Sequence, residues 1–185
     1  MKFLDKFLRQ WRISVAMRHV PETMEYVYDI GCDDGYLINQ LKPYTTRQDG
    51  VDPCLGKDLI SSNSSLKKGY FPSVIDQSQM QEKYNAIFAL AVIEHFSEND
   101  ILSSGPVIAK MLSPKGRLII SVPHPFVDKI LHVLSLLNLV DADTLDEHHG
   151  FDPALLPVYL ADSLKLVKHK KFQLGLNNIY VFERY

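Results

Sequence analysis

Short apolar segments separated by polar turns recur along most of the chain. Residues 84–91 form an almost wholly apolar run with the length of a buried strand. Residues 37–41 follow a glycine-bearing turn and are expected to be helical. Strands that alternate with helices favour an α/β fold built on a parallel sheet. The expected strands cover residues 24–29, 49–52, 74–77, 84–91, 117–123, 168–175 and 177–183.

Residues 2–18 have the spacing of an amphipathic helix, with cations on its polar face and aromatic side chains on its apolar face. We expect this helix to cover the sheet and a ligand site. The alternative is that it lies in a membrane interface, where basic helices with aromatic residues bind. The apolar face comprises Phe3, Leu4, Phe7, Leu8, Trp11 and Val15, and the polar face Lys2, Asp5, Lys6, Arg9 and Arg12.

A second apolar stretch, residues 125–140, follows the fifth expected strand. This position places it above the carboxyl edge of the sheet, where α/β proteins bind their ligands. It is either the wall of a site for an apolar molecule or a helix of the core. With the acidic residues that follow, it forms a lid-like insertion at 125–152.

The strongest functional signal is the sequence Tyr-Asp-Ile-Gly-Cys-Asp-Asp-Gly-Tyr, from Tyr28 to Tyr36. Asp29 ends the first expected strand, and a turn containing Gly31 and Gly35 leads into the helix. The first glycine lets the backbone turn tightly, and the second lets the helix approach the strand and a ligand. Such a strand-turn-helix unit holds small ligands at the carboxyl edge of a sheet.

This turn resembles the first motif of the class I S-adenosylmethionine (SAM) dependent methyltransferases, whose pattern is acidic-x-Gly-x-Gly-x-Gly. Asp33 stands where the family has its middle glycine, and aspartate tolerates a positive φ better than most residues. The resemblance implies that Asp29, Gly31, Asp33 and Gly35 hold the methionine part of the cofactor. A nicotinamide dinucleotide site is the main alternative, but it needs Gly-x-Gly-x-x-Gly, which this turn lacks.

Later motifs continue the resemblance in the family's order. Asp52 ends the second expected strand, where an acid can bind both ribose hydroxyls. Asp76 and Gln77 end the third expected strand, where the family places a polar group beside the adenine. After the fourth strand, Val-Ile-Glu-His-Phe is similar to the family's Glu-His motif. The resemblance therefore implies that Ala91 and Glu94 line the floor of the site.

The resemblance covers residues 24–125 well and continues more loosely to the end of the chain. It implies a single α/β domain over residues 1–185, with a Rossmann-like doubly wound sheet. Seven strands are expected, mainly parallel, and the last hairpin supplies an antiparallel strand. The helix at residues 1–20 would cover the site, so that Arg12 or Arg18 reaches the SAM carboxylate.

The implied function is methyl transfer to a small molecule, and oxygen is the favoured acceptor atom. A general base assists when a hydroxyl is methylated, and histidine is suited to that role at neutral pH. We expect the base to be His124, His148 or His149, in that order, with His95 last. No metal site is expected, and no serine-nucleophile motif is present. The apolar stretch favours an apolar or amphipathic acceptor.

Composition limits the other functions that this chain can have. With 185 residues, 46% of them hydrophobic, one domain with a substantial core is expected. A formal net charge of -2 gives no overall field that favours nucleic acid. Cys32 and Cys54 lack the spacing of a metal or redox motif, which indicates a cytoplasmic protein, with peripheral membrane contact as an alternative. A second functional interpretation is a non-catalytic SAM-binding module that acts through a protein partner.

Overall fold

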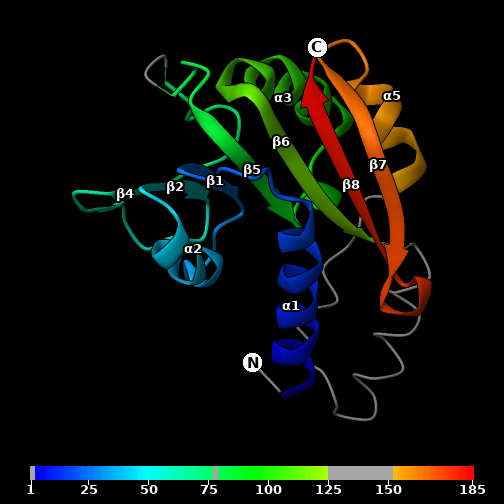
Figure 1. The fold of residues 1–185 in the computed structure, drawn as a ribbon, viewed down its shortest axis with the longest axis horizontal. Coiled ribbons are helices and arrows are strands. Elements are labelled where there is room, and N and C mark those ends of the chain that lie inside the picture. Colours follow the sequence, from blue (N-terminus) through cyan, green and yellow to red (C-terminus); the bar gives the residue numbers. More distant parts are fainter. Residues whose placement is uncertain (1–2, 77–78, 125–151) are drawn as a thin grey trace.

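The computed structural model describes residues 3–76, 79–124 and 152–185, which form one mixed sheet with helices on both faces (Figure 1). The strand order across the sheet is β3-β4-β2-β1-β5-β6-β8-β7. The strands are β1 (Tyr26–Ile30), β2 (Arg47–Asp52), β3 (Leu59–Ile60), β4 (Ser64–Lys68), β5 (Tyr84–Leu90), β6 (Leu112–Pro123), β7 (Leu164–Phe172) and β8 (Asn177–Arg184). The helices are α1 (Phe3–Ala16), α2 (Tyr36–Leu41), α3 (Glu98–Met111) and α5 (Leu156–Leu160), with 3₁₀ turns η1 (Met17–His19), η2 (Lys42–Tyr44), η3 (Ile93–His95), η5 (Pro153–Leu155) and η6 (Gln173–Gly175).

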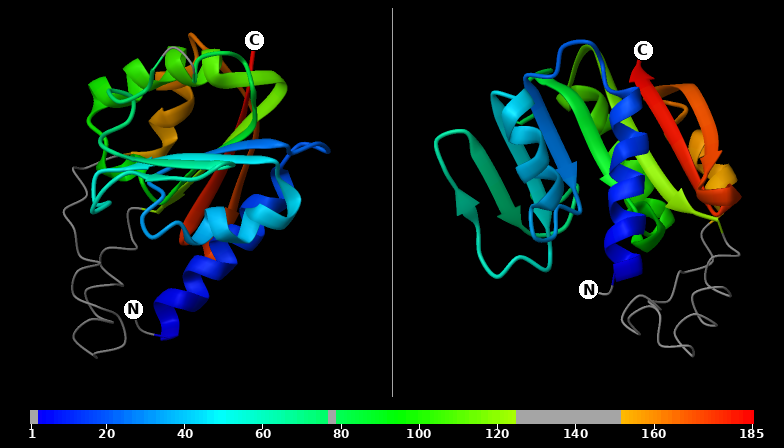
Figure 2. Two further views of the ribbon diagram at one scale, coloured as in Figure 1. Left: turned by 90° about the vertical axis from the view of Figure 1, so that its left-hand side faces the viewer. Right: turned by 60° about the horizontal axis from the view of Figure 1, so that its bottom comes forward.

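The sheet separates two apolar cores. Figure 2 shows α1 and α2 on one face of the sheet and α3 and α5 on the other. Successive residues of a strand point to opposite faces, so Phe88 packs with Leu41 on the first side while Ile87 packs with Ile108 on the second. This double burial explains why residues 84–91 form a continuous apolar run without alternation.

Strand directions confirm the doubly wound fold. β8 is antiparallel to both β6 and β7, whereas β1, β2, β4, β5 and β6 pair in parallel with one another. The antiparallel strand from the last hairpin is therefore confirmed. The expected count of seven is wrong, because the short β3 pairs antiparallel with β4 at the far edge and makes an eighth strand.

The third expected strand, at residues 74–77, is also wrong. Its place in the sheet is taken by β4, and Val74 lies in a turn, where its N–H donates to Tyr70 O at 3.2 Å. Only Ser64 and Leu66 of β4 are buried, so this strand has a weak apolar signal. The β-branched pair Val74 and Ile75 gives a stronger one, although the pair only packs against the edge of the core.

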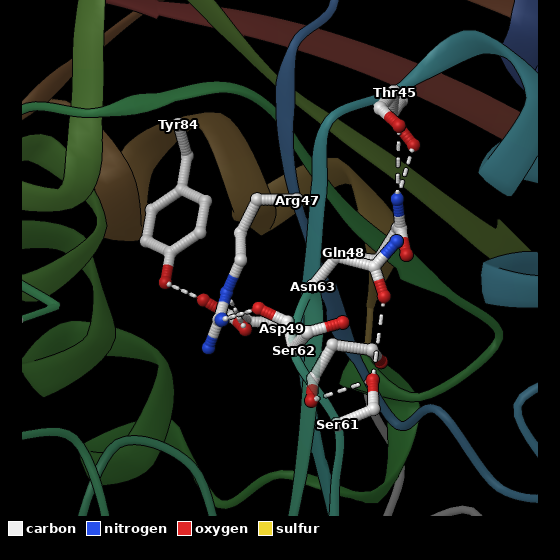
Figure 3. Close-up of polar contacts among 9 residues, drawn as sticks. Thr45, Arg47, Gln48, Asp49, Ser61, Ser62, Asn63 and Tyr84 are labelled. Carbon is white, nitrogen blue, oxygen red and sulfur yellow. Dashed lines mark hydrogen bonds and ion pairs between the residues drawn. The ribbon is translucent and has the colours of Figure 1, made fainter.

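A buried polar network fixes the start of β2 (Figure 3). Tyr84 Oη donates to Asp49 Oδ2 at 2.7 Å, and Arg47 Nε donates to Asp49 Oδ1 at 2.8 Å. Gln48 Nε2 donates to Thr45 Oγ1 at 2.8 Å. Polar side chains can occupy a central strand because they are paired in this way. The network ties β2 to β5 and so holds the register that brings the end of β2 to the carboxyl edge.

α1 presents an unexpected side to the sheet. Ile13 and Ala16 are buried against it, whereas Phe7 and Trp11 are 51% and 36% exposed. The helix covers the sheet as expected, but with Ile13 and Ala16 and not with the two aromatic residues. Arg12 lines a cavity, and the aromatic side lies outward. Within the described ranges, no helix has both the length and the hydropathy that crossing a bilayer requires.

Candidate functional site

A cavity of about 790 Å³ lies at the carboxyl ends of β1, β2, β4 and β5. Leu8, Arg9 and Arg12 of α1 line one side of it, and Gln173 and Asn177 line another. Open α/β sheets bind their ligands beyond the carboxyl ends of the strands. The cavity therefore lies where the sequence places the ligand site.

The turn between β1 and α2 has the conformation that its glycines suggest. Gly31 has a φ of +77°, and a Cβ added there would lie 2.7 Å from Val92 Cγ2. Gly35 has a φ of +72° and would place a Cβ 3.3 Å from Leu66 Cδ1. Asp33 has a φ of 43°, so the aspartate keeps the turn that the family builds with glycine. Gly31 and Asp33 line the cavity, whereas Gly35 shapes the turn from behind.

Asp52 is held by the backbone of two loops. It is 8% exposed and accepts hydrogen bonds from Asp33 N at 2.9 Å and from Cys54 N at 2.7 Å. These two bonds engage different carboxylate oxygens. A carboxylate oxygen has two lone pairs, and the Cys54 thiol also hydrogen-bonds this carboxylate. Asp52 is thus fixed in place, and two hydroxyl ligands would bind it by displacing the thiol, which is a weak donor.

Asp29 is a buried carboxyl group beside Asp52. It is 4% exposed and lines the cavity. Burial, together with the charge of Asp52, raises the pKa of Asp29 well above its usual value, while Arg9 opposes the rise. A carboxylate that is costly to ionise in the empty site gains from a cationic ligand. The end of β1 is therefore suited to an ammonium or sulfonium group.

Arg12 brings a positive charge into the same cavity. Burial lowers the pKa of its guanidinium, and the charge of Glu94, which is 3% exposed, opposes this effect. Arg12 Nε is buried and has no hydrogen-bond partner among the described residues. Arg18, the other cation considered from the sequence, is exposed and is not among the residues that line the cavity. Arg12 is thus the better placed of the two to bind an anionic group.

A surface latch holds α1 over the glycine-bearing turn. Arg9 forms an ion pair with Asp34 and lies 4.2 Å from the ring centroid of Tyr36. The guanidinium of Arg9 holds the pKa of Asp34 below its usual value. Tyr36 Oη also donates to Gln10 Oε1 at 3.0 Å. These contacts join α1 to the start of α2 beside the cavity that Arg9 lines.

The far end of the cavity differs from the expectation for the adenine position. Its lining comes from the segment directly after β4, namely Gly69, Tyr70, Phe71 and Ser73, and from Pro53 and Cys54 after β2. Asp76 is exposed, forms an ion pair with Lys67 at 2.7 Å, and is not among the lining residues. The strand at this position is β4 and not residues 74–77, so the strand on which the assignment of Asp76 to the adenine rested is absent. Gln77 lies outside the described residues.

Residues at the start of β8 form an oriented pair of amides. Gln173 Nε2 donates to Leu8 O at 3.0 Å, so Gln173 Oε1 is free to accept, and Asn177 Nδ2 donates to it at 2.5 Å. Asn177 Oδ1 is consequently an acceptor, and it is buried without a hydrogen-bond partner among the described residues. A buried carbonyl without a partner is costly. A hydroxyl or amine of a bound molecule would complete it.

The expected catalytic histidines are only partly placed. Pro123 lines the cavity but the next residue, His124, is not among the lining residues. The backbone N–H of His124 donates to Leu176 O at 2.8 Å, which holds it beside the amide pair. His95 does line the cavity. His148 and His149 lie outside the described residues, so their roles remain predictions.

The remaining expected residues, Ala91 and Glu94, both line the cavity. Sequence analysis did not point to Arg9, Tyr70 or the pair formed by Gln173 and Asn177. Only Tyr70 had a usable signal, because it follows Gly69 at the end of a short strand with alternating burial. The others come from segments far apart in the sequence.

Comparison with known proteins agrees with this geometry. A family model described as a methyltransferase domain matches residues 3–170. The ubiquinone biosynthesis O-methyltransferase of Bradyrhizobium diazoefficiens is 25% identical over 145 residues, which are 74% of this chain and 56% of that protein. The chain thus spans little more than half the length of this curated relative.

Solved structures share the fold. The methyltransferase partner of the Haloferax volcanii Trm112 activator matches with a TM-score of 0.71 and 14% identity, over 95% of this chain and 90% of that one. The N-methyltransferase NodS of Bradyrhizobium japonicum, solved with S-adenosylhomocysteine, matches with a TM-score of 0.62 and 15% identity, over 95% of this chain and 86% of that one. A SAM-dependent methyltransferase of Mesorhizobium loti matches with a TM-score of 0.69 and 13% identity, over 92% of this chain and 96% of that one. Since the family model covers most of its length, the chain belongs to the class I SAM-dependent methyltransferase family.

Proposed function

We propose that this protein transfers the methyl group of SAM to an oxygen atom of a small apolar or amphipathic molecule. The observation that carries the proposal is the set of charges in one cavity: Asp29 and Asp52 at adjacent strand ends, with Arg12 of α1. SAM has groups that match each of them, namely an ammonium group, two ribose hydroxyls and a carboxylate.

The described residues fit this cofactor. Asp52 is held by two backbone N–H groups, and the ribose hydroxyls would take the place of its bond with the weakly donating Cys54 thiol. Asp29 would hold the cationic end, and Arg12 Nε offers a donor to the carboxylate. Gly31 lines the cavity and, without a Cβ, lets this turn pack closely against Val92. On the far side, the residues after β4 supply a partly aromatic wall that suits a planar base.

Bound SAM supplies a methyl group that its sulfonium already activates. The chain's own residues then have to align the acceptor and exclude water. The latch between Arg9, Asp34 and Tyr36 keeps α1 over the site, which shields it from solvent. Glu94 lies on the floor beside Arg12 and orients that side chain through its charge.

The acceptor would bind at the amide pair. Asn177 Oδ1 can accept a hydrogen bond from a second hydroxyl or an amine of the acceptor, and Leu8 and Phe96 add apolar surface. We propose His124 as the base that removes the proton, because its backbone is bonded beside Asn177. The relative that is named as an O-methyltransferase supports oxygen as the target. Because NodS is named as an N-methyltransferase, amines belong in the panel of acceptors that tests the proposal.

The test is a methyl-transfer assay with SAM and a panel of phenols, catechols and long-chain alcohols, each paired with an amine of the same skeleton. Transfer to a hydroxyl compound is expected. His124→Ala should then lower kcat by about 10²–10⁴-fold and leave the Kd for SAM unchanged. His169→Ala is the matched control, because the His169 ring stacks on Tyr180 with centroids 4.2 Å apart and is hydrogen-bonded to Asn178 Oδ1 at 3.0 Å. An unaltered kcat in His124→Ala would remove His124 from this role.

A second candidate is a SAM-binding module that needs a protein partner. The observation in its favour is that one neighbour was solved with an activator protein. Under this alternative the purified chain binds SAM but methylates no compound of the panel. Turnover would appear only when a partner recovered by pull-down is added. Transfer by the chain alone would exclude this candidate.

A further inference from the structure

The outward side of α1 carries two exposed aromatic residues. Phe7 is 51% and Trp11 36% exposed, and their rings meet edge-on with centroids 5.7 Å apart. They lie one helical turn apart, opposite the side on which Ile13 and Ala16 are buried. Single exposed apolar residues need no explanation, but two aromatic rings in contact form a small continuous apolar surface.

A third apolar side chain lies at the same end of the molecule. Leu174, in the turn between β7 and β8, is 96% exposed and has a φ of 58°, which is unfavourable for leucine. Its neighbour Gln173 is bonded to Leu8 O at 3.0 Å, and this contact places the turn beside α1. Figure 1 shows the N-terminal half of α1 and this turn together at the carboxyl edge of the sheet.

Exposed lysines flank these apolar side chains. Lys6 precedes Phe7 on α1, and Lys170, on the last part of β7, lies on the same face of the sheet as α1, because it pairs with Ile179 of the core beneath that helix. Lys171 points to the opposite face. The whole chain has a formal net charge of -2, so these cations are a local feature. Asp34, an acid near α1, is neutralised by Arg9. The charge of this end of the molecule therefore complements a negatively charged surface.

We propose that these five residues, the apolar–basic rim (Phe7, Trp11, Leu174, Lys6 and Lys170), dock on an anionic lipid surface. The aromatic rings and Leu174 would enter the interfacial region, and the lysines would reach the headgroups. This is the pattern of an interfacial helix whose apolar side faces the bilayer while its other side packs on the protein.

Docking in this way gives the cavity an entrance at the membrane. Leu8 and Gln173 line the cavity and are bonded to each other, and their chain neighbours Phe7 and Leu174 belong to the rim. An amphipathic acceptor in the lipid would thus reach the site without crossing water. This consequence rests on the proposed function, whereas lipid binding by the rim does not.

Trp11 makes the test direct, because it is the chain's one tryptophan. The purified chain is mixed with phosphatidylcholine vesicles that contain or lack phosphatidylglycerol, with no cofactor or acceptor present. With anionic vesicles, the emission of Trp11 should shift to the blue, brominated lipid should quench it, and the protein should float with the vesicles. Binding should weaken with added salt, as electrostatic attraction is screened.

Variants locate the surface while keeping the reporter. Phe7→Ser should weaken partitioning by about tenfold, and Lys6→Glu with Lys170→Glu should reduce binding to anionic vesicles selectively. Tyr44→Ser is the matched control: Tyr44 is 71% exposed and precedes β2, at the opposite edge of the sheet. It should bind like the unaltered chain.

Three results would overturn the proposal. The first is an unshifted emission with no flotation, and the second is binding that Phe7→Ser and the lysine changes leave intact. The third is a Trp11 emission that is already blue-shifted without vesicles. If this shift depends on protein concentration, a second copy of the chain covers Trp11. If it does not, another part of this chain covers it. Because the assay contains no SAM, its failure would leave the methyltransferase proposal standing.

Discussion

Replacing Asp52 by alanine tests the cofactor site through its best-defined side chain. Each hydrogen bond from a ribose hydroxyl to a carboxylate contributes about 1.5–3 kcal/mol, so two contribute about 3–6 kcal/mol. This corresponds to about 10²–10⁴-fold in Kd. The charge of Asp52 also raises the pKa of Asp29, so its removal lets Asp29 ionise more easily and offsets part of the loss. We therefore expect SAM to bind about 10²-fold more weakly.

The same change costs some stability. Alanine leaves the N–H groups of Asp33 and Cys54 without their acceptor, at about 0.5–1.5 kcal/mol each. For a chain of this size the melting temperature should fall by roughly 2–10 °C. The variant should therefore remain folded at the temperature of the titration, which circular dichroism verifies.

The assay is a calorimetric titration with SAM and with S-adenosylhomocysteine. Asp76→Ala is the matched control, because Asp76 is an exposed carboxylate paired with Lys67. Its affinity for SAM should equal that of the unaltered chain. A folded Asp52→Ala variant that binds SAM within about threefold of the unaltered chain, a difference below 1 kcal/mol, would refute the assignment of Asp52 to the ribose.

Three other changes probe the site and its support. Gly31→Ala should destabilise the fold by about 2–5 kcal/mol, because the φ of Gly31 is positive and the new Cβ would clash with Val92. Denaturant unfolding measures this loss, with Gly56→Ala as a neutral control. SAM binding should release a proton from Asp29, so the affinity for SAM should fall as the pH drops through the raised pKa of Asp29. The calorimetric heat of SAM binding should then depend on the ionisation enthalpy of the buffer. In Asp29→Asn this dependence should be absent. Tyr84→Phe should cost about 1.5–3 kcal/mol by removing a bond to the buried Asp49; an unchanged unfolding midpoint would contradict this.

Much of the site follows from local sequence because its turn is a local structure. Gly31 and Gly35 need a positive φ and a close approach, so their spacing identifies the turn without tertiary information. Asp33 shows the same logic, since aspartate can adopt the conformation that glycine usually provides. Apolar strands such as β5 are also evident, because burial on both faces leaves a continuous run.

Other parts depend on contacts that no local pattern contains. β4 is a polar strand near the sheet's edge, so its signal is weaker than that of Val74 and Ile75, and the third strand was placed at the wrong residues. The choice between Arg12 and Arg18 depends on how α1 rotates against the sheet. The role of Asn177 emerges only from the chain of bonds through Gln173 to Leu8.

The outward position of the aromatic side of α1 also depends on tertiary contacts that the local sequence does not contain. A helix with cations on one side and aromatic residues on the other predicts two faces, but it does not say which face meets the protein. Here Arg12 lines the cavity, and Ile13 and Ala16 cover the sheet beside it. Phe7 and Trp11 are left on the outer side as a result.

The most direct test of the central claim is a crystal structure of the chain with S-adenosylhomocysteine. The account predicts that the ribose hydroxyls bond to Asp52, that the amino and carboxylate groups lie at Asp29 and Arg12, and that the adenine lies against the segment that includes Tyr70. Adenine beside Asp76, or a ligand bound outside this cavity, would contradict it.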